Sequence, residues 1–245
     1  MTEAQKSQGG VKTGIFGLDQ ILKGGIRRKN SVLITGTPGT GKTILALQFI
    51  LAGAKNGEAG LYITAEESVE SICNCAESIG LNIKKYIDNK LITILEQPIS
   101  DGRLAVSFDK PLRLIESKKI KRVVVDSLTL LEYIYGNSPL GFRKSILGFI
   151  TKVKKANATL LVTSEAATGG YDNFIYRAQD YLFDGLIILT KIRKGSSFER
   201  CLSIVKMRGQ EHMVDVYPFS IKSGGIAVYP DQIPFSLIEK DIPKR

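Results

Sequence analysis

The sequence lacks any apolar run long enough to cross a membrane, because none reaches the roughly 18 residues that a spanning helix needs. The first ten residues, MTEAQKSQGG, are polar and lack the apolar stretch of a signal peptide. Cysteine is scarce too: three cysteines, an odd number in a chain of 245 residues, argue against a disulfide framework. These absences predict a cytoplasmic protein that does not associate with membranes.

Internal repeats, low-complexity segments and a convincing linker are also missing from the sequence. An apolar fraction of 43% is enough for a packed core and excludes wholesale disorder. We therefore expect a flexible tail over residues 1–12 and a single domain over residues 13–245.

Acidic residues are the scarcer kind of charge. The 24 Asp and Glu residues face 34 Lys and Arg residues, which leaves a formal net charge of +10. A surplus of this size favours anionic partners such as nucleotides, nucleic acids or acidic membranes. A lysine-rich surface that only keeps the protein in solution is the alternative, and charge alone does not decide between them.

Short apolar runs alternate along the chain with segments of helical spacing. The apolar runs predict strands at residues 31–36, 60–68, 91–97, 122–127, 158–166, 184–192 and 200–207. Helices are predicted at residues 42–55, after a capping Ser68, and at residues 112–118 and 141–155; a hairpin is predicted around Gly224 and Gly225. This order predicts an α/β fold: a mostly parallel twisted sheet with helices on both faces and antiparallel strands at the C-terminal end.

The stretch GTPGTGKT, Gly36 to Thr43, matches G-x-x-x-x-G-K-[ST] at every position and lies between a predicted strand and a predicted helix. In such a P-loop the backbone N–H groups and the helix N-terminus bind phosphates. We expect Lys42 to reach the β- and γ-phosphates of ATP and the Thr43 hydroxyl to ligate Mg²⁺. The predicted nucleotide-binding residues of the loop are Thr37, Pro38, Gly39, Thr40, Gly41, Lys42 and Thr43. The alternative is a glycine-rich turn that only packs closely.

A P-loop site needs a second group on the metal side, and Asp126 ends the apolar run VVVD. This is the usual form of a Walker B aspartate, which holds Mg²⁺, often through water. The alternative is that Asp126 caps the next turn, because Asp-Ser is common at strand ends. Beside a P-loop, the metal role is the better interpretation.

Hydrolysis also needs a base that orients or deprotonates water. Glu66 and Glu67 end the predicted strand 60–68, at the carboxyl edge where α/β sheets bind ligands. Adjacent residues of an extended chain point to opposite sides, so we assign them different roles. Glu66 is the predicted base, and Glu67 is expected to pair with a basic neighbour or to tune the site. A solvated acidic loop is the alternative.

These motifs together resemble the RecA superfamily and, within it, the KaiC-like ATPases, in particular the single-domain KaiC/RadA paralogues of archaea. The resemblance extends from about residue 13 to residue 230. It is carried by TGIFGLDQILKGGI, the P-loop, YITAEES, VVVDS, LLVTSEA, VKMRGQEH and YPFSIKSGGIAVYP. It implies a RecA-like core that forms rings, commonly hexamers, with ATP or ADP bound between neighbouring subunits.

The resemblance implies roles for six further residues. Lys206 and Arg208 would reach the γ-phosphate bound by the adjacent subunit, and Met207 between them would belong to the same contact. His212 would lie near the ribose or base of that nucleotide. The other two expected nucleotide contacts are Ser78, on the P-loop side, and Ser164, a polar sensor at a strand end. A solvated basic strand end is the alternative for Lys206 and Arg208 when they are read alone.

The chain departs from the clock proteins of this family, which carry two such domains. It has one, and the segment ATGGYDNFIYRAQD lacks an adjacent Ser/Thr pair, which argues against autophosphorylation and a circadian role. Two functions stay open: a ring-forming Mg²⁺-dependent regulatory ATPase that acts on an unknown protein partner, or a recombinase paralogue that binds single-stranded DNA and uses ATP as a switch. The basic turn RRK at residues 27–29 would be a solvent-facing turn or a DNA contact.

Overall fold

The computed structural model describes residues 9–96, 108–134, 138–166, 175–194 and 196–238. Its strands are β1 (Ser31–Gly36), β2 (Gly60–Thr64), β3 (Ile92–Glu96), β4 (Arg122–Asp126), β5 (Thr159–Glu165), β6 (Gly185–Lys194), β7 (Ser197–Met207), β8 (Val216–Lys222) and β9 (Gly225–Val228). Its helices are α1 (Leu18–Ile21), α2 (Lys42–Lys55), α3 (Val69–Ser78), α4 (Lys84–Asp88), α5 (Asp109–Ser117), α6 (Leu128–Ile134), α7 (Pro139–Lys155), the 3₁₀ helix η2 (Ala178–Leu182) and α8 (Phe235–Ile238).

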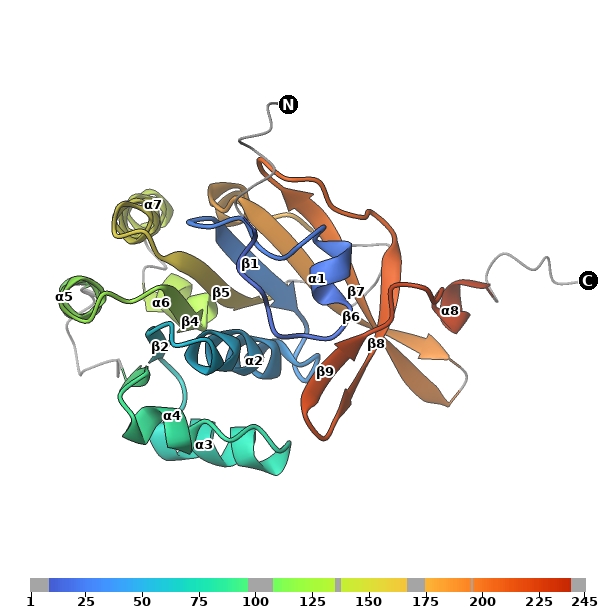
Figure 1. Ribbon diagram of the computed structural model, residues 1–245. Helices are drawn as coiled ribbons and strands as arrows, with labels where there is room; N and C mark the ends of the chain where they lie inside the picture. The colour runs from blue at the N-terminus through green and yellow to red at the C-terminus, as the bar shows by residue number, and fades with distance from the viewer. Residues whose placement is uncertain (1–8, 97–107, 135–137, 167–174, 195, 239–245) are drawn as a thin grey trace, which may run out of the picture.

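The strands form one sheet in the order β3-β2-β4-β5-β1-β6-β7-β8-β9 (Figure 1). The strands from β3 to β6 in this order pair in parallel, and β7, β8 and β9 pair antiparallel. The predicted fold class is therefore confirmed. Strand β1 lies inside the parallel part, and all six of its residues are buried, which is why its sequence is continuously apolar except at its two ends.

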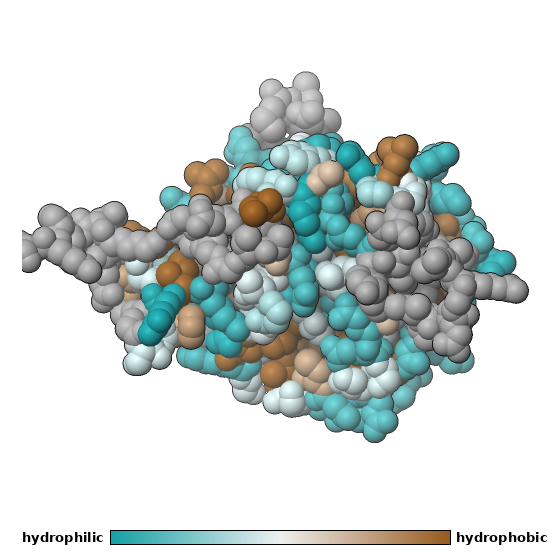
Figure 2. Space-filling model, turned by 180° about the vertical axis from the view of Figure 1, so that it is seen from behind, coloured by the Kyte–Doolittle hydropathy of each residue, from teal (hydrophilic) through white to brown (hydrophobic). Residues whose placement is uncertain are grey.

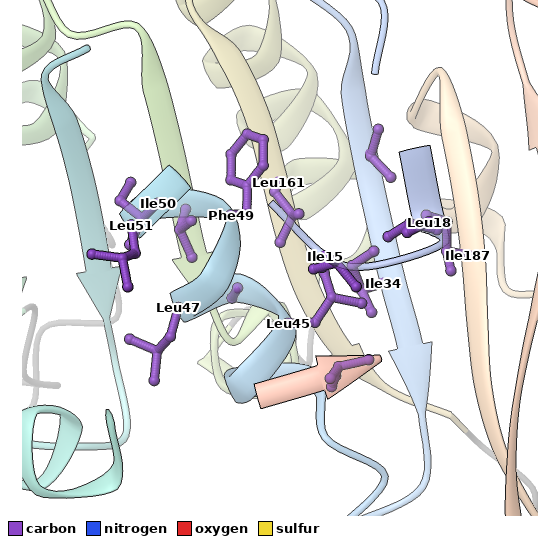
Figure 3. Packing of buried hydrophobic residues seen from close by; sticks show 14 of the residues in the cluster. Ile15, Leu18, Ile34, Leu45, Leu47, Phe49, Ile50, Leu51, Leu161 and Ile187 are labelled. Atoms are coloured by element: carbon purple, nitrogen blue, oxygen red, sulfur yellow. The ribbon is translucent and has the colours of Figure 1, made fainter. Parts of the chain in front are cut away.

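Each face of the sheet has its own apolar core. On one face, Leu45 and Phe49 of α2 pack with Ile34, Leu161 and Ile187 of the sheet (Figure 3). On the other face, α5, α6 and α7 cover the alternate residues of the same strands, and Phe108 stacks on Phe149 with ring centroids 4.3 Å apart. Successive side chains of a strand point to opposite faces of the sheet, so they face α2 and α7 in turn.

The hairpin β8–β9 is tied to the P-loop helix by one buried amide. Gln48 of α2, 6% exposed, donates from Nε2 to the carbonyl oxygens of Gly224 and Ile226, and its Oε1 accepts from the Ile226 N–H at 2.7 Å. The side chain of Gln48 thus pairs with polar main-chain groups of the hairpin, as a neighbouring strand would. These bonds hold the last strands of the chain beside α2 (Figure 1).

The structure corrects several predicted boundaries. The tail does not extend to residue 12: Val11 is buried and exchanges two main-chain hydrogen bonds with Ile26. The strand predicted over residues 60–68 ends at Thr64, because the Thr64 hydroxyl closes a turn by donating to the carbonyl of Glu67 and accepting its N–H. Ser68 caps α3 as predicted, accepting from the Ser71 N–H. The short helices α4, α6 and α8 were not predicted.

The surface is mixed in polarity. The face in Figure 2 shows mainly hydrophilic residues, with hydrophobic ones in separate groups. Within the described ranges, none of the helices combines the length and the apolar character needed to cross a bilayer.

Arg122, at the start of β4, is 2% exposed and joins three parts of the chain. Its guanidinium donates to the Glu58 carboxylate at 2.7 Å and to the carbonyl oxygens of Lys12 and Phe49 at 2.7 and 2.9 Å, and it lies over the Phe49 ring. Burial lowers the pKa of Arg122, and Glu58 acts in the opposite direction. An uncharged side chain would leave the carboxylate and both carbonyls, that of Phe49 buried, without this donor.

We therefore expect Arg122→Met to lower the free energy of unfolding by about 3 kcal/mol, the cost of removing one partner of a buried pair. The matched control is Arg28→Met, because Arg28 is 53% exposed and its guanidinium lies 3.7 Å from the same carboxylate; its effect should stay below about 1 kcal/mol. Denaturant unfolding measures both variants. Equal decreases in the free energy of unfolding would show that the burial of Arg122 adds nothing to its contribution to stability.

Candidate nucleotide site

The P-loop, residues 37–41, connects the carboxyl end of β1 to the N-terminus of α2. Gly41 precedes the helix with φ of 106°, and a Cβ there would lie 2.9 Å from the Ile221 side chain. Gly36 packs so closely on β6 that a Cβ would lie 2.3 Å from the carbonyl oxygen of Leu189. Both positions therefore require glycine, one for its backbone conformation and one for space.

Lys42 lies across the mouth of the loop. Its ammonium donates to the carbonyl oxygens of Gly36 and Thr37, at 2.9 and 3.2 Å. Burial lowers the pKa of Lys42, and the carboxylates of Glu165, Asp126 and Glu66 act in the opposite direction. A half-buried cation facing three carboxylates and a loop rich in N–H groups is suited to bind a phosphate chain together with a divalent cation.

The structure brings the predicted Asp126 to this site. The hydroxyl of the buried Tyr62 donates to Asp126 Oδ2 at 2.5 Å, and the Thr163 hydroxyl donates to Oδ1. Burial, followed by the charge of Asp126, raises the pKa of Tyr62 well above its usual value, so the phenol remains a donor. Two fixed donors orient the carboxylate at the end of β4 and leave its other lone pairs for a ligand.

Glu66 and Glu67 lie in the turn after β2 and point to different places. Glu66 accepts a hydrogen bond from the hydroxyl of Ser127, the residue after Asp126, and the charge of its carboxylate raises the pKa of Lys42. Glu67 instead accepts from the Ser71 hydroxyl of α3 at 2.6 Å. The two carboxylates therefore point to different places, as predicted, but they do so because of a turn and not because of strand alternation. The roles assigned to them stay predictions. No basic partner of Glu67 occurs among the described residues.

The magnesium prediction can be compared with the side chains present. Thr43, the second residue of α2, and Asp126 are the predicted ligands. Among the described residues, no group of three or more His, Cys, Asp and Glu could hold a metal ion by itself. The Mg²⁺ role of Thr43 and Asp126 therefore stays a prediction.

Two residues of the site were missed by the sequence reasoning. Glu165 ends β5 directly opposite Gly36, and it has the largest effect of the three carboxylates on the pKa of Lys42. Lys191 of β6 donates to the carbonyl of Pro38 at 3.0 Å. The signal for Glu165 was present, because LLVTSEA is a strand that ends in a carboxylate; Lys191 had no local signal.

Four of the residues predicted to contact a nucleotide lie outside the cluster around Lys42, Asp126 and Glu66. Ser78 is exposed in the last turn of α3, where its hydroxyl donates to the carbonyl of Cys75. Ser164 is buried on the face of the sheet opposite Asp126 and accepts from Arg177. Met207 is 5% exposed, and its side chain packs in the core of its own chain, so it does not face outward with its neighbours. His212 is half-buried, with Nδ1 3.0 Å from the carbonyl oxygen of Met213.

Lys206 and Arg208 lie side by side, next to the N-terminal end of β1, whereas the P-loop follows the C-terminal end of that strand. The Arg208 N–H donates to the carbonyl of Asp184, whose own N–H donates to Ser31, the first residue of β1. The P-loop follows the last residue of β1, five residue steps away, or about 16 Å along the strand. The two predicted halves of the site are therefore far apart within one chain.

Comparison with known proteins places this geometry in context. The family model described as "ATPase: KaiC" matches residues 11–233. The circadian clock oscillator protein KaiC of Parasynechococcus marenigrum is 33% identical over 229 residues, which cover 90% of this chain and 44% of that protein. UPF0273 protein PH0284 of Pyrococcus horikoshii is 32% identical over 238 residues, 91% of this chain and 95% of that protein. The chain thus spans less than half of the clock protein but nearly all of the Pyrococcus protein, and the resemblance found in the sequence is confirmed.

The Tyr62–Asp126 hydrogen bond gives a direct test of the metal side. Tyr62→Phe removes one of the two donors that orient the carboxylate, so the apparent Mg²⁺ affinity in the presence of ATP should fall about 10- to 100-fold, the loss expected when a hydrogen bond that orients a metal ligand is removed. Binding of a fluorescent ATP analogue, titrated with Mg²⁺, measures this. Tyr229→Phe is the control, because its hydroxyl lies 2.7 Å from that of Ser220 in the β8–β9 hairpin, outside the site. Identical titrations for the two variants would contradict the prediction.

Proposed function

The chain belongs to the KaiC family of ATPases, and from this premise we propose that it is a regulatory ATPase that binds Mg²⁺-ATP in its P-loop and hydrolyses it within a homo-oligomeric ring. The observation that carries the proposal is the separation of the two halves of the site. The P-loop, Asp126 and Glu66 gather at the carboxyl edge of the sheet, whereas Lys206 and Arg208 lie at the amino edge. The second half therefore serves the nucleotide of an adjacent subunit.

Each residue has a physical role in this proposal. The P-loop N–H groups and Lys42 bind the phosphates, and Thr43 and Asp126 hold Mg²⁺, which neutralises charge on the phosphate oxygens. Glu66, held by the Ser127 hydroxyl, orients or deprotonates the attacking water. The neighbour's Arg208 suits the γ-phosphate because its planar fork binds two oxygens, and Lys206 adds a second cation on the same side.

Exposed apolar residues beside the pair support an interface there. Ile175, Tyr176 and Tyr181 are 58%, 47% and 59% exposed, and the Lys206 ammonium lies 5.7 Å from the centre of the Tyr181 ring. Large exposed aromatic side chains next to cations are typical of a surface that a partner covers. A second subunit that brings its phosphates to the pair would cover both.

The first test is ATP turnover by single variants. Lys42→Ala should lose ATP binding, whereas Glu66→Gln should bind ATP but turn it over about 100-fold more slowly, as expected for loss of a general base. Arg208→Ala should also bind ATP and lose about 1,000-fold in kcat, as for an arginine that acts across an interface. Arg113→Ala, at an exposed position of α5, is the control. Normal turnover by Arg208→Ala would reject the inter-subunit role.

A mixture of variants gives a sharper test. Lys42→Ala subunits keep an intact Lys206–Arg208 pair, and Arg208→Ala subunits keep an intact P-loop. Mixing the two inactive proteins should recover part of the activity, because some interfaces combine the intact halves. Activity that stays at the level of the separate variants would show that both groups act within one chain.

Single-stranded nucleic acid binding is a second candidate, favoured by a basic basin at the amino edge of the sheet. The basin has a volume of about 580 Å³, and its charged lining is Arg28, Lys29, Glu58, Lys118, Lys119 and Lys121. The one acidic member is already paired with Arg122 and Arg28. Within the described part of the chain, the ammonium groups of Lys29, Lys119 and Lys121 have no hydrogen-bond or ion-pair partner. No aromatic residue lines the basin, so it would bind phosphates and not stack bases.

Salt dependence tests this second function. The double variant Lys119→Ala/Lys121→Ala should weaken binding of a single-stranded DNA oligonucleotide and reduce the slope of log K against log salt by about 1.4, or about 0.7 per lost phosphate contact. Lys144→Ala/Lys152→Ala, on the exposed face of α7, is the matched control and should leave the slope unchanged. Fluorescence anisotropy measures both. Failure of the unaltered protein to bind at low salt would remove this function.

A further inference from the structure

The Lys206–Arg208 pair is anchored by consecutive main-chain carbonyls of η2. The Lys206 ammonium donates to the carbonyl of Asp180 at 2.9 Å, and the Arg208 guanidinium donates to that of Tyr181 at 3.2 Å. Burial lowers the pKa of Lys206, and the charge of Arg208 lowers it further, so the two cations repel each other. The position of η2 therefore fixes where both cations stand.

Arg177 holds η2 in place. Its main-chain N–H donates to Asp180 Oδ2 at 2.7 Å, which closes the first turn of η2, and its Nη1 donates to Glu132 of α6 at 3.1 Å. Glu132 also accepts from Gln179 of η2 at 2.7 Å, so α6 is joined to η2 twice. Asp180 is 2% exposed, and Oδ1 has no hydrogen-bond partner among the described residues, with Arg177 Nε 3.9 Å away. Without the guanidinium this buried carboxylate would lose its nearest cation.

The same guanidinium also contacts the end of β5, next to the site on its own chain. Arg177 Nη2 donates to the Ser164 hydroxyl at 2.6 Å, and Ser164 pairs in register with Thr35 of β1. The Thr129 hydroxyl lies 3.4 Å from that of Ser164 and accepts the Glu165 N–H at 2.8 Å. Arg177 thus connects the end of β5, beside the P-loop, with η2, whose carbonyls anchor the Lys206–Arg208 pair.

We propose that Arg177 is a positioning residue, which sets the geometry of the Lys206–Arg208 pair that the chain donates to its neighbour and ties that geometry to the end of β5 in its own site. The inference rests on the proposed function, because it takes the pair to act on the nucleotide of the adjacent subunit. Arg177 itself touches no reacting atom. It acts through η2, and the contacts of its guanidinium with Glu132, Ser164 and Asp180 suit a planar fork and not a lysine ammonium.

Arg177→Ala should leave ATP binding intact, lower kcat about 10- to 100-fold, the cost of misplacing a catalytic group by about 1 Å, and change KM less than about 2-fold. Arg177→Lys should recover only part of the loss. Glu132→Gln, which keeps the shape but weakens the ion pair, should lower kcat less and in the same direction, so the test remains if Arg177→Ala does not fold. Arg113→Ala is again the control. Unchanged kcat in Arg177→Ala would overturn the proposal.

Mixed subunits separate the donated role from an effect on the own site. Arg177→Ala subunits keep their P-loop, and Lys42→Ala subunits keep a correctly held pair, so mixing them should recover activity as the Arg208→Ala mixture does. Recovery only in the Arg208→Ala mixture would place Arg177 in its own site and overturn the inference while the proposed function stands. Full turnover by Arg208→Ala alone would instead reject the proposed function, and this inference with it.

Discussion

The parallel register of β1 between β5 and β6 is the constraint on which the rest of the structure depends. It sets Gly36 opposite Glu165 on one side and opposite Leu189 on the other, at the point where β1 turns into the P-loop. A slip of β1 by one residue would turn Ile34 from the core beside α2 to the core beside α7 and Leu33 the other way, and it would move Gly36 out of line with Glu165 and Leu189. The continuous burial of β1 on both faces makes such a slip costly.

Much of this arrangement could be predicted from the sequence. The strand before the P-loop, the helix after it, the strand that contains VVVD and the general alternation of strands with helices are local patterns, and they were found where they were expected, apart from the short helices and the end of β2. The position of Asp126 could be predicted because an apolar strand that ends in a carboxylate is visible in the sequence alone, without knowledge of tertiary contacts. The turn at Glu66 could not, because it depends on the Thr64 hydroxyl, which a strand would also accommodate.

The remaining contacts depend on pairs of residues far apart in the chain. Lys191 reaches the P-loop only because β6 lies beside β1, and Ser164 faces Arg177 because its parity on β5 directs it away from Asp126. The role of Arg177 had no sequence signal, since its partners come from α6, β5 and η2. Of the segment 167–180, used in the argument against autophosphorylation, residues 167–174 lie outside the described residues.

The bond between Gln48 and the β8–β9 hairpin has a consequence for how the protein is made. The helix that opens the phosphate site is synthesised before the hairpin, and its buried amide has its partners only after residues 224–226 have left the ribosome. An unpaired buried amide is destabilising, so the nascent chain should hold this helix loosely until the hairpin emerges. Competence to bind a nucleotide would then arise together with β8 and β9, which would limit the exposure of a half-formed site during translation.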